Sequence, residues 1–136
     1  MQANPYLSFN GQCEEAFKFY ETALGGKIEM MMSHVGTPAE QQVPPEWREK
    51  IMHARLRVGD SLLMASDAPP GRYQKPSGFS INLQANGPAE AERSFAALAE
   101  KGTVQMPLAA TFFADRFGVL VDQFGIPWMV YCEKAA

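Results

Sequence analysis

The sequence has few cysteines, few histidines and no concentration of charge or of apolar residues. Its 136 residues include two Cys and two His, and the formal net charge is −3. Because the basic residues are scattered, the sequence offers no electrostatic footprint for nucleic acid or an anionic membrane. No apolar run reaches the roughly 20 residues of a membrane span, and the first residues lack the basic and apolar regions of a signal peptide. We therefore expect a cytoplasmic protein that binds neither nucleic acid nor membrane.

The two cysteines do not indicate a disulfide framework. Cys13 lies on the apolar face of an expected helix and Cys132 in an expected strand, so buried free thiols are preferred to a redox pair. A chain of this size buries roughly two-thirds of the surface that its unfolded form exposes, so it needs neither a disulfide nor a metal to fold. We expect residues 1–136 to form a single domain.

Two amphipathic helices are predicted by the spacing of apolar residues. Residues 12–24 and 88–101 repeat apolar side chains every three or four positions, as a helix with one buried face does. Gly25-Gly26 and Gly102 follow the two helices. Since glycine readily takes the left-handed conformation after a last turn, these glycines are expected to end the helices.

Each helix is preceded by one short strand and followed by three more, which is an α+β pattern. The expected strands are 3–9, 27–35, 51–58 and 61–66, then 79–85, 103–113, 116–122 and 127–133. A shift of 76 residues superimposes Asn10-Gly11 on Asn86-Gly87 and Gly26 on Gly102, and helix starts and stops coincide at the same offset. The sequence thus predicts two tandem β-α-β-β-β repeats, at about 1–68 and 77–136.

Residues 36–50 interrupt the first repeat with three prolines and Trp47. Proline prevents a regular continuation of helix or strand, so we expect an ordered excursion rather than a linker between domains. Trp47 has two possible roles: it covers a pocket or a partner surface, or it pins the loop to the body of the protein.

Three stretches carry a resemblance to a known superfamily: NPYLSFNGQCEEAFKFYETALGGKI, KIMHARLRVGDSLLMASD and DRFGVLVDQFGIPWMV. Together with the repeat they resemble the vicinal oxygen chelate superfamily, which includes glyoxalase I, extradiol dioxygenases and bleomycin- and fosfomycin-resistance proteins. Within it they look like the PhnB-like, or demethylubiquinone methyltransferase-like, branch. The resemblance covers nearly the whole chain. It implies the glyoxalase/bleomycin resistance-like fold with cupped mixed sheets, a small-molecule site inside the cups, and a homodimer.

Strand alternation predicts which side chains face the cup, because successive residues of a strand point to opposite faces. On the third strand His53, Arg55 and Arg57 share one side, which forms either a cationic wall suited to a carboxylate, phosphate or phosphonate, or a solvated face. Arg116, at the start of the matching strand, is a further candidate. The predicted ligand-binding residues are Tyr6, Ser8, His53, Arg55, Met64, Ser80, Asn82, Arg116, Met129 and Tyr131.

The resemblance also implies where a metal would bind. Metal-dependent members place His, Glu or Gln on the first and last strands of each repeat, and the matching positions here are Asn4 (or, in an ungapped match, Pro5), Met64, Ser80 and Met129. None is a strong ligand for a divalent metal. The thioethers of the two methionines suit Cu(I), the asparagine and serine side chains are neutral, and proline is no ligand. The two histidines, His34 and His53, lie in the second and third strands. We therefore expect no metal and no cofactor.

No nucleophile-elbow, phosphate-loop, C-x-x-C or H-E-x-x-H motif is present, and no glycine-rich turn of the Rossmann kind supports a methyltransferase. The sequence leaves open whether the protein is an enzyme. The leading hypothesis is a metal-independent protein that binds a small anionic or polar molecule in the cup. One alternative is a glyoxalase-like or dioxygenase-like metalloenzyme. Another is a drug-sequestering resistance protein, with aromatic residues from Phe112, Phe113, Trp128 and Tyr131.

Overall fold

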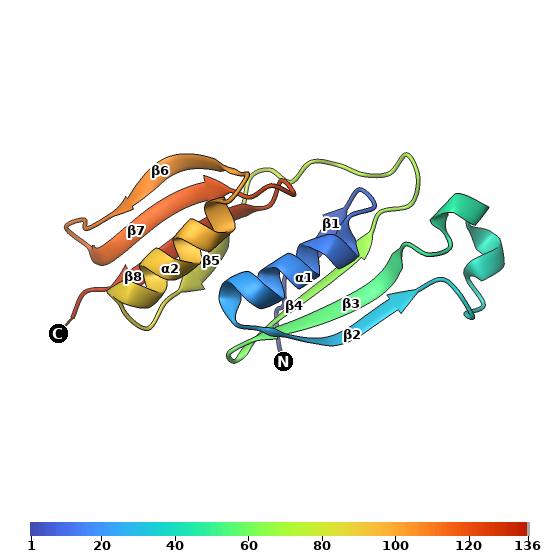
Figure 1. Ribbon diagram of the computed structural model, residues 1–136, viewed down its shortest axis with the longest axis horizontal. Coiled ribbons are helices and arrows are strands. Elements are labelled where there is room, and N and C mark those ends of the chain that lie inside the picture. Colours follow the sequence, from blue (N-terminus) through green and yellow to red (C-terminus); the bar gives the residue numbers. More distant parts are fainter. Residues whose placement is uncertain (136) are drawn as a thin grey trace. The chain divides into compact units, whose positions relative to one another are not determined.

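The computed structural model describes residues 1–135. The chain divides into two compact units, and the boundary between them in the sequence is between Gln74 and Lys75. Each unit contains one α-helix and four strands, which are labelled in Figure 1. The first has β1 (Tyr6–Phe9), α1 (Cys13–Leu24), β2 (Lys27–Ser33), β3 (Ile51–Val58) and β4 (Ser61–Asp67). The second has β5 (Ile81–Gln84), α2 (Pro88–Ala99), β6 (Thr103–Ala109), β7 (Ala114–Val121) and β8 (Pro127–Glu133).

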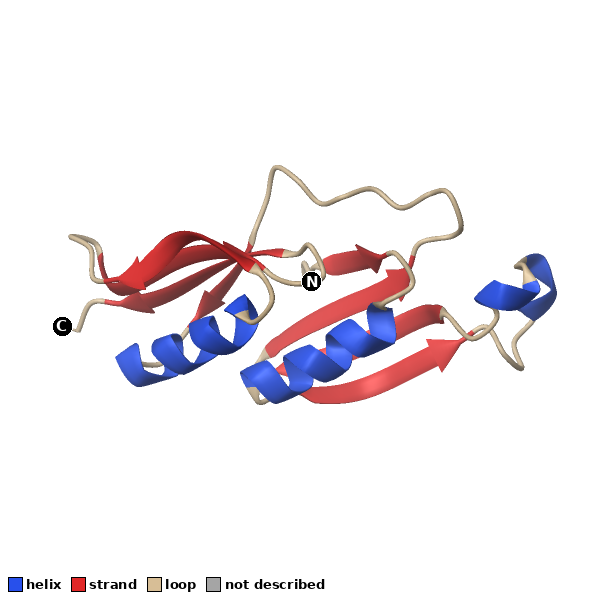
Figure 2. Cartoon of the chain, turned by 45° about the horizontal axis from the view of Figure 1, so that its top comes forward, coloured by secondary structure: helices blue, strands red, loops and turns tan. Residues whose placement is uncertain are grey.

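The two units have the same topology. The strand order is β1-β4-β3-β2 in the first sheet and β5-β8-β7-β6 in the second. In each sheet the first and last strands of the unit are parallel, and the other pairs are antiparallel. One helix accompanies each sheet (Figure 2). The predicted α+β fold of two tandem β-α-β-β-β repeats is confirmed.

The strand that was expected to run to residue 113 ends at Ala109. The cause is a turn that Thr111 organises, because its hydroxyl oxygen accepts hydrogen bonds from the backbone N–H groups of Phe113 (3.2 Å) and Ala114 (3.0 Å). Such side-chain bonds to the backbone compete with the ladder of a sheet. The next strand consequently begins at Ala114, two residues earlier than expected.

The core of each unit lies between its helix and one face of its sheet. In the first unit Cys13, Ala16, Phe17 and Tyr20 of α1 are fully buried, and so are Ala54 and Leu56 of β3. In the second unit α2 buries an equivalent stripe. Fully burying a side chain of the size of leucine or phenylalanine contributes about 1.5–3 kcal/mol. Both cysteines are free and buried, as expected.

Two buried carboxylates fasten the ends of strands. Asp67, at the end of β4, accepts hydrogen bonds from the backbone N–H groups of Cys13 (2.9 Å) and Ile51 (2.8 Å). Asp122 follows β7 and accepts bonds from two backbone N–H groups of the β7–β8 turn and from the indole Nε1 of Trp128 (2.9 Å). Hydrogen bonds to a charged group are worth more than neutral ones. These two aspartates are therefore structural.

The glycines after the helices act in two different ways. Gly25 is left-handed, with φ 66°, and ends α1 as expected. Gly102 is not left-handed; the left-handed residue after α2 is Lys101, with φ 58°. At Gly26 and Gly102 the requirement is space, because a Cβ would lie 2.8 Å from the carbonyl oxygen of Arg57 and 2.5 Å from that of Val121, respectively. The expectation that Gly102 ends its helix by conformation was wrong.

Residues 36–50 are ordered and contain two short 3₁₀ turns, Glu40–Gln42 and Pro45–Trp47. The Lys50 ammonium donates a hydrogen bond to the carbonyl oxygen of Gly11 (2.9 Å), and the Trp47 ring lies 3.7 Å from where a Cβ of Gly11 would be. The side chains therefore hold this loop to the loop before α1, which favours the pinning role for Trp47.

Among residues 1–135, neither the length nor the hydropathy of any helix is sufficient for a membrane span.

We predict that Lys101→Gly increases the free energy of unfolding by about 0.5–1 kcal/mol. The left-handed conformation costs a residue with a side chain about 1–2 kcal/mol, and glycine removes this cost. The greater entropy of glycine in the unfolded chain offsets part of the resulting stabilisation. Urea denaturation measures the change. Lys101→Ala is the control, because alanine keeps the unfavourable conformation and removes only the long side chain. Equal stabilisation by both substitutions would contradict the explanation.

Candidate functional site

Except for Arg116, the strand residues that the sequence predicts to face the cup lie on the sheet faces opposite the helices, which we call the helix-free faces. In the first sheet, strand pairing places Tyr6 beside Met64, and Met64 beside Arg55, in one row across β1, β4 and β3. Neighbours along each strand point the other way and are buried, with Leu7 4% and Ala54 0% exposed. The helix-free face of the first sheet therefore unites Tyr6, Ser8, His53, Arg55 and Met64. The row continues into β2 at Met30, which the sequence analysis did not single out.

Tyr6 and His53 form a pair on this face. The phenol oxygen of Tyr6 lies 3.2 Å from Nδ1 of His53, and the two rings are stacked with centroids 5.9 Å apart. The pairing fixes the orientation of the imidazole. It also leaves Nε2 of His53 without a hydrogen-bond partner among residues 1–135. A bound molecule can thus receive hydrogen bonds from this ring nitrogen or donate to it.

The two arginines of β3 differ in their partners. Arg57 is held by Glu29, with Nε 3.2 Å and Nη2 3.4 Å from the two carboxylate oxygens. The hydrogen bond from Arg57 lowers the pKa of Glu29, with a smaller contribution from the charge of Arg55. Arg55 itself has no carboxylate within 4.0 Å in the described part of the chain, and its buried Nε has no hydrogen-bond partner there. Of the two β3 arginines, Arg55 is therefore the one with unused hydrogen-bonding capacity.

The helix-free face of the second sheet is uncharged where the first is cationic. Asn82 of β5 lies beside Met129 of β8, and Met129 lies beside Val119 of β7. Tyr131 occupies the next position along β8 on the same face, beside Phe117. Ser80 precedes β5 in the phase of Asn82. Strand pairing therefore places Asn82, Met129 and Tyr131 on one face, as the sequence predicted, whereas Ser80 lies before the paired residues of β5.

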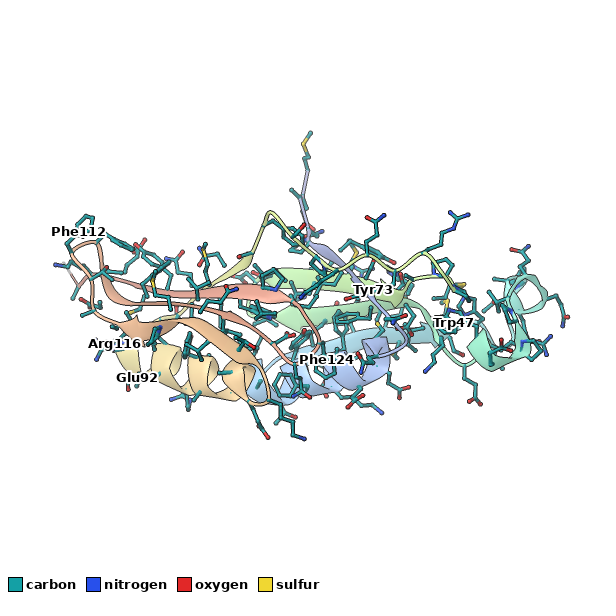
Figure 3. The ribbon with its side chains drawn as sticks, turned by 90° about the horizontal axis from the view of Figure 1, so that it is seen from above. Trp47, Tyr73, Glu92, Phe112, Arg116 and Phe124 are labelled. Carbon is teal, nitrogen blue, oxygen red and sulfur yellow. The ribbon has the colours of Figure 1, made fainter. Side chains whose placement is uncertain are left out.

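Arg116 does not join this face. It is paired with Cys132, whose side chain is buried on the helix-facing side, and its Nε donates a hydrogen bond to Glu92 of α2 (3.0 Å). Figure 3 shows Arg116 and Glu92 together beside α2. The sequence analysis missed this because it matched Arg116 to β3 across the repeat. Alternation within β7 was the better signal, since Arg116 has the same phase as the buried Leu120.

The structure also contains a cleft in the second unit that the sequence analysis did not foresee. Its volume is about 530 Å³, and it lies between residues 75–80 and the sheet. Of the residues predicted from sequence, only Ser80 and Met129 line it. The others are Lys75, Pro76, Ser77, Gly78, Phe79, Gln105, Val121, Gly125 and Pro127. The predicted strand 79–85 includes only Phe79 and Ser80 of this segment, and no strand or helix pattern marks residues 75–78, so periodicity gave no signal for those four.

The four positions that the superfamily resemblance matches to metal ligands do not offer the donors of a divalent-metal site. Asn4, Met64, Ser80 and Met129 supply an amide, a hydroxyl and two thioethers, whereas Mg, Mn, Fe and Ni sites use carboxylate or imidazole ligands. Within residues 1–135 no three or more His, Cys, Asp and Glu side chains are grouped as a metal site. His34, the second histidine, bonds through Nδ1 to the carbonyl oxygen of Lys50 (3.0 Å).

Comparison with known proteins identifies the family. The sequence pattern of the 3-demethylubiquinone-9 3-methyltransferase family matches residues 1–131. The chain belongs to this family. It is 35% identical to Protein YjdN of Escherichia coli (strain K12) over 142 residues, which cover 98% of this chain and 97% of that protein. Membership places it in the vicinal oxygen chelate superfamily, as the motifs indicated.

Solved structures of this family and superfamily share the fold. Protein PA1353 from Pseudomonas aeruginosa matches with a TM-score of 0.90 and 51% identity, over 99% of each chain. A putative 3-demethylubiquinone-9 3-methyltransferase, PhnB protein, from Bacillus cereus matches with a TM-score of 0.80 and 22% identity, over 97% of this chain and 99% of that one. The fosfomycin resistance protein FosX from Listeria monocytogenes has a TM-score of 0.65 and 8% identity, over 98% and 93% of the chains. At such identities the last two show the fold alone.

We predict that neither cysteine reacts with Ellman's reagent in the native protein at pH 8. Burial raises the pKa of the Cys13 thiol, and the nearby charges of Asp67 and Glu14 raise it further, so the nucleophilic thiolate does not form. Cys132 is 3% exposed. The absorbance of released thionitrobenzoate measures the reaction, and the protein unfolded in guanidinium chloride, where both thiols react, is the control. A rapidly reacting native thiol would show that a cysteine is accessible for chemistry.

Proposed function

We propose that this protein binds a small anionic molecule on the helix-free face of its first sheet, without a divalent metal. The observation that carries the proposal is Arg55, a cation with a buried Nε that no described residue satisfies. A guanidinium presents a planar fork of donors that matches carboxylate, phosphate and phosphonate groups. Burying a donor without an acceptor costs free energy. An anion that accepts a hydrogen bond from Arg55 would remove this cost as it binds.

The neighbours of Arg55 support an anionic ligand of small size. His53 adds an oriented imidazole, and Tyr6 adds a phenol that is 49% exposed. Met64 lies directly between Tyr6 and Arg55 in the row across the sheet and offers an apolar, adaptable surface. A few polar groups on an apolar floor is the usual composition of a small-molecule site. Ser8 extends the polar surface along β1.

The other functions considered for this fold have less support. Methyl transfer, which the family name describes, lacks the glycine-rich strand-to-helix turn that holds nucleotide-like cofactors in a parallel sheet. A pocket for large drugs was expected to take its aromatic residues from Phe112, Phe113, Trp128 and Tyr131. Trp128 is instead 1% exposed and bonded to Asp122, whereas Phe112 is 90% exposed. Trp128 is therefore not available to such a pocket, although Phe112 and Phe113 are in ring contact with each other.

We also propose that the protein is a cytoplasmic homodimer and that its two units form a single domain. Support for a dimer comes from β6 and the β6–β7 turn, where Val104 (43%), Met106 (48%), Phe112 and Phe113 (44%) are exposed. Exposed apolar patches of this kind mark interaction surfaces.

We predict that Arg55→Met weakens the binding of phosphate, phosphonoacetate or malonate, measured by isothermal titration calorimetry. A hydrogen bond to a charged group contributes about 1.5–3 kcal/mol, so affinity should fall roughly 10- to 100-fold. Methionine preserves most of the length and packing of the side chain. Arg57→Met is the matched control, because Glu29 already occupies Arg57, and its affinity should stay close to the original.

The two arginine variants also define the failure of the proposal. If Arg57→Met weakened binding as much as Arg55→Met, a diffuse positive field rather than a site would be responsible. If the unmodified protein bound none of the three anions at millimolar concentration, the proposed function would be wrong.

We predict that anion affinity is unchanged by EDTA and that dialysed protein carries Mn, Fe, Ni and Zn at well below one ion per chain. The reason is the donor set, since amide, hydroxyl and thioether groups are weak ligands for these ions. Inductively coupled plasma mass spectrometry gives the metal content, and calorimetry with and without EDTA gives the affinity. Stoichiometric metal, or loss of binding in EDTA, would favour the metalloenzyme alternative.

A further inference from the structure

The cleft of the second unit has the size of a small-molecule site. Its volume of about 530 Å³ lies within the range of about 300–1,000 Å³ that is usual for ligand pockets. One wall is the segment 75–80, which has neither helix nor strand, and the other is formed by β6, β7 and β8. All of these residues belong to the second unit. The lining of the cleft therefore comes from the second unit and shares no residue with the Arg55 site.

The floor of the cleft is apolar and rigid. Val121 and Pro127 are paired across β7 and β8, and Met129 lies two residues further along β8 on the same face. The side chains that alternate with them, Leu120 and Trp128, are 0% and 1% exposed. Because the opposite face is packed into the core, the floor residues are fixed in position. Phe79, 55% exposed, adds an aromatic ring from the segment side.

The polar groups around this floor have no partners of their own. Four polar side chains line the cleft: Lys75, Ser77, Ser80 and Gln105. None of the four makes a side-chain hydrogen bond or ion pair with any residue from 1 to 135. Lys75 is the single charged residue in the lining, and no carboxylate accompanies it. The cleft thus has one unneutralised positive charge, neutral hydroxyl and amide donors, and an apolar floor.

We propose that this cleft binds a small monocarboxylic acid with an apolar body about the size of a benzene ring. The carboxylate lies against the Lys75 ammonium and the hydroxyl groups of Ser77 and Ser80, and the body rests on Met129 and Val121. An ammonium is a point charge that tolerates many approach directions, whereas a guanidinium selects planar, bidentate anions. The cleft is accordingly a second site, with a different ligand preference from the Arg55 face.

The segment that closes the cleft has a defined conformation. Gly78 has φ 78°, which side-chain-bearing residues rarely adopt, and a Cβ there would have nothing within 4 Å. Gly78→Ala consequently changes the backbone preference of the segment without a clash with any described atom. This substitution separates the shape of the segment from the chemistry of its side chains.

The proposal is tested by titrating 4-fluorophenylacetate and its neutral counterpart 4-fluorophenylethanol into the protein, with ¹⁹F NMR as the readout. We expect the unmodified protein to bind the acid more tightly than the alcohol. Lys75→Met should weaken the acid at least about 5-fold and remove the preference for it, because a charge-assisted hydrogen bond is lost. Lys134→Met, an exposed lysine of the same unit outside the cleft, is the matched control and should change neither affinity.

Two further variants test the location of the site. Met129→Glu places a carboxylate on the floor and should abolish binding of the acid, and Gly78→Ala should weaken the acid and the alcohol alike. Thermal unfolding of each variant verifies that the protein is folded. Failure of the acid to bind at millimolar concentration, or equal weakening by Lys75→Met and Lys134→Met, would overturn the proposal.

The same titrations distinguish this site from the Arg55 face. Arg55→Met should leave the affinity for 4-fluorophenylacetate unchanged, and Lys75→Met should leave the affinity for phosphate unchanged. Loss of 4-fluorophenylacetate binding in Arg55→Met would show that there is one site rather than two. Loss of phosphate binding alone would count against the proposed function and leave the cleft as it stands.

Discussion

The packing of one helix against one face of each sheet is the constraint on which the rest of the structure depends. Burying Phe17 and Tyr20 of α1, and Phe95 and Leu98 of α2, requires an apolar partner surface on the sheet, which β1, β3, β4, β7 and β8 supply. Because side chains alternate along a strand, satisfying that surface also fixes what points away from the helix. A slip of one residue would bury Arg55 and expose Leu56. The chemistry of the helix-free faces is thus a consequence of how the core is built.

The two units use one backbone plan for two different surfaces. In the first, Arg57 is neutralised by Glu29, and Arg55 stays available. In the second, Arg116 lies on the helix side and is neutralised by Glu92, so the positive charge near the sheet comes from Lys75 in the connecting segment. The repeat preserves the packing of helix on sheet and leaves the opposite face free to differ. Such divergence is how one fold accommodates many functions.

Predictions that rest on local periodicity agreed with the structure, and those that rest on matching the repeats agreed less well. Helix stripes and the phases of β1, β3, β5 and β8 follow from residues within each element, such as the alternation of Leu7 with Tyr6. Matching Arg116 to β3 by its place at the start of the corresponding strand misplaced it, because such a match ignores the irregularity in register between Ala114 and Arg116 of β7. The expectation for Gly102 was also wrong. Gly102 corresponds to Gly26, where a side chain has no space, and Lys101 corresponds to Gly25, which has the left-handed conformation.

The sequence by itself determined the two repeats, the buried stripe of each helix and the residue types of the candidate ligand site. These features depend on residue type and on spacing along one element. The tertiary structure alone decided which charges remain free. Whether Glu29 reaches Arg57 rather than Arg55, and whether residues 75–80 leave a cleft above Met129, depends on distances between segments far apart in the chain. Such distances are set by the packing of whole elements, and no local pattern encodes them.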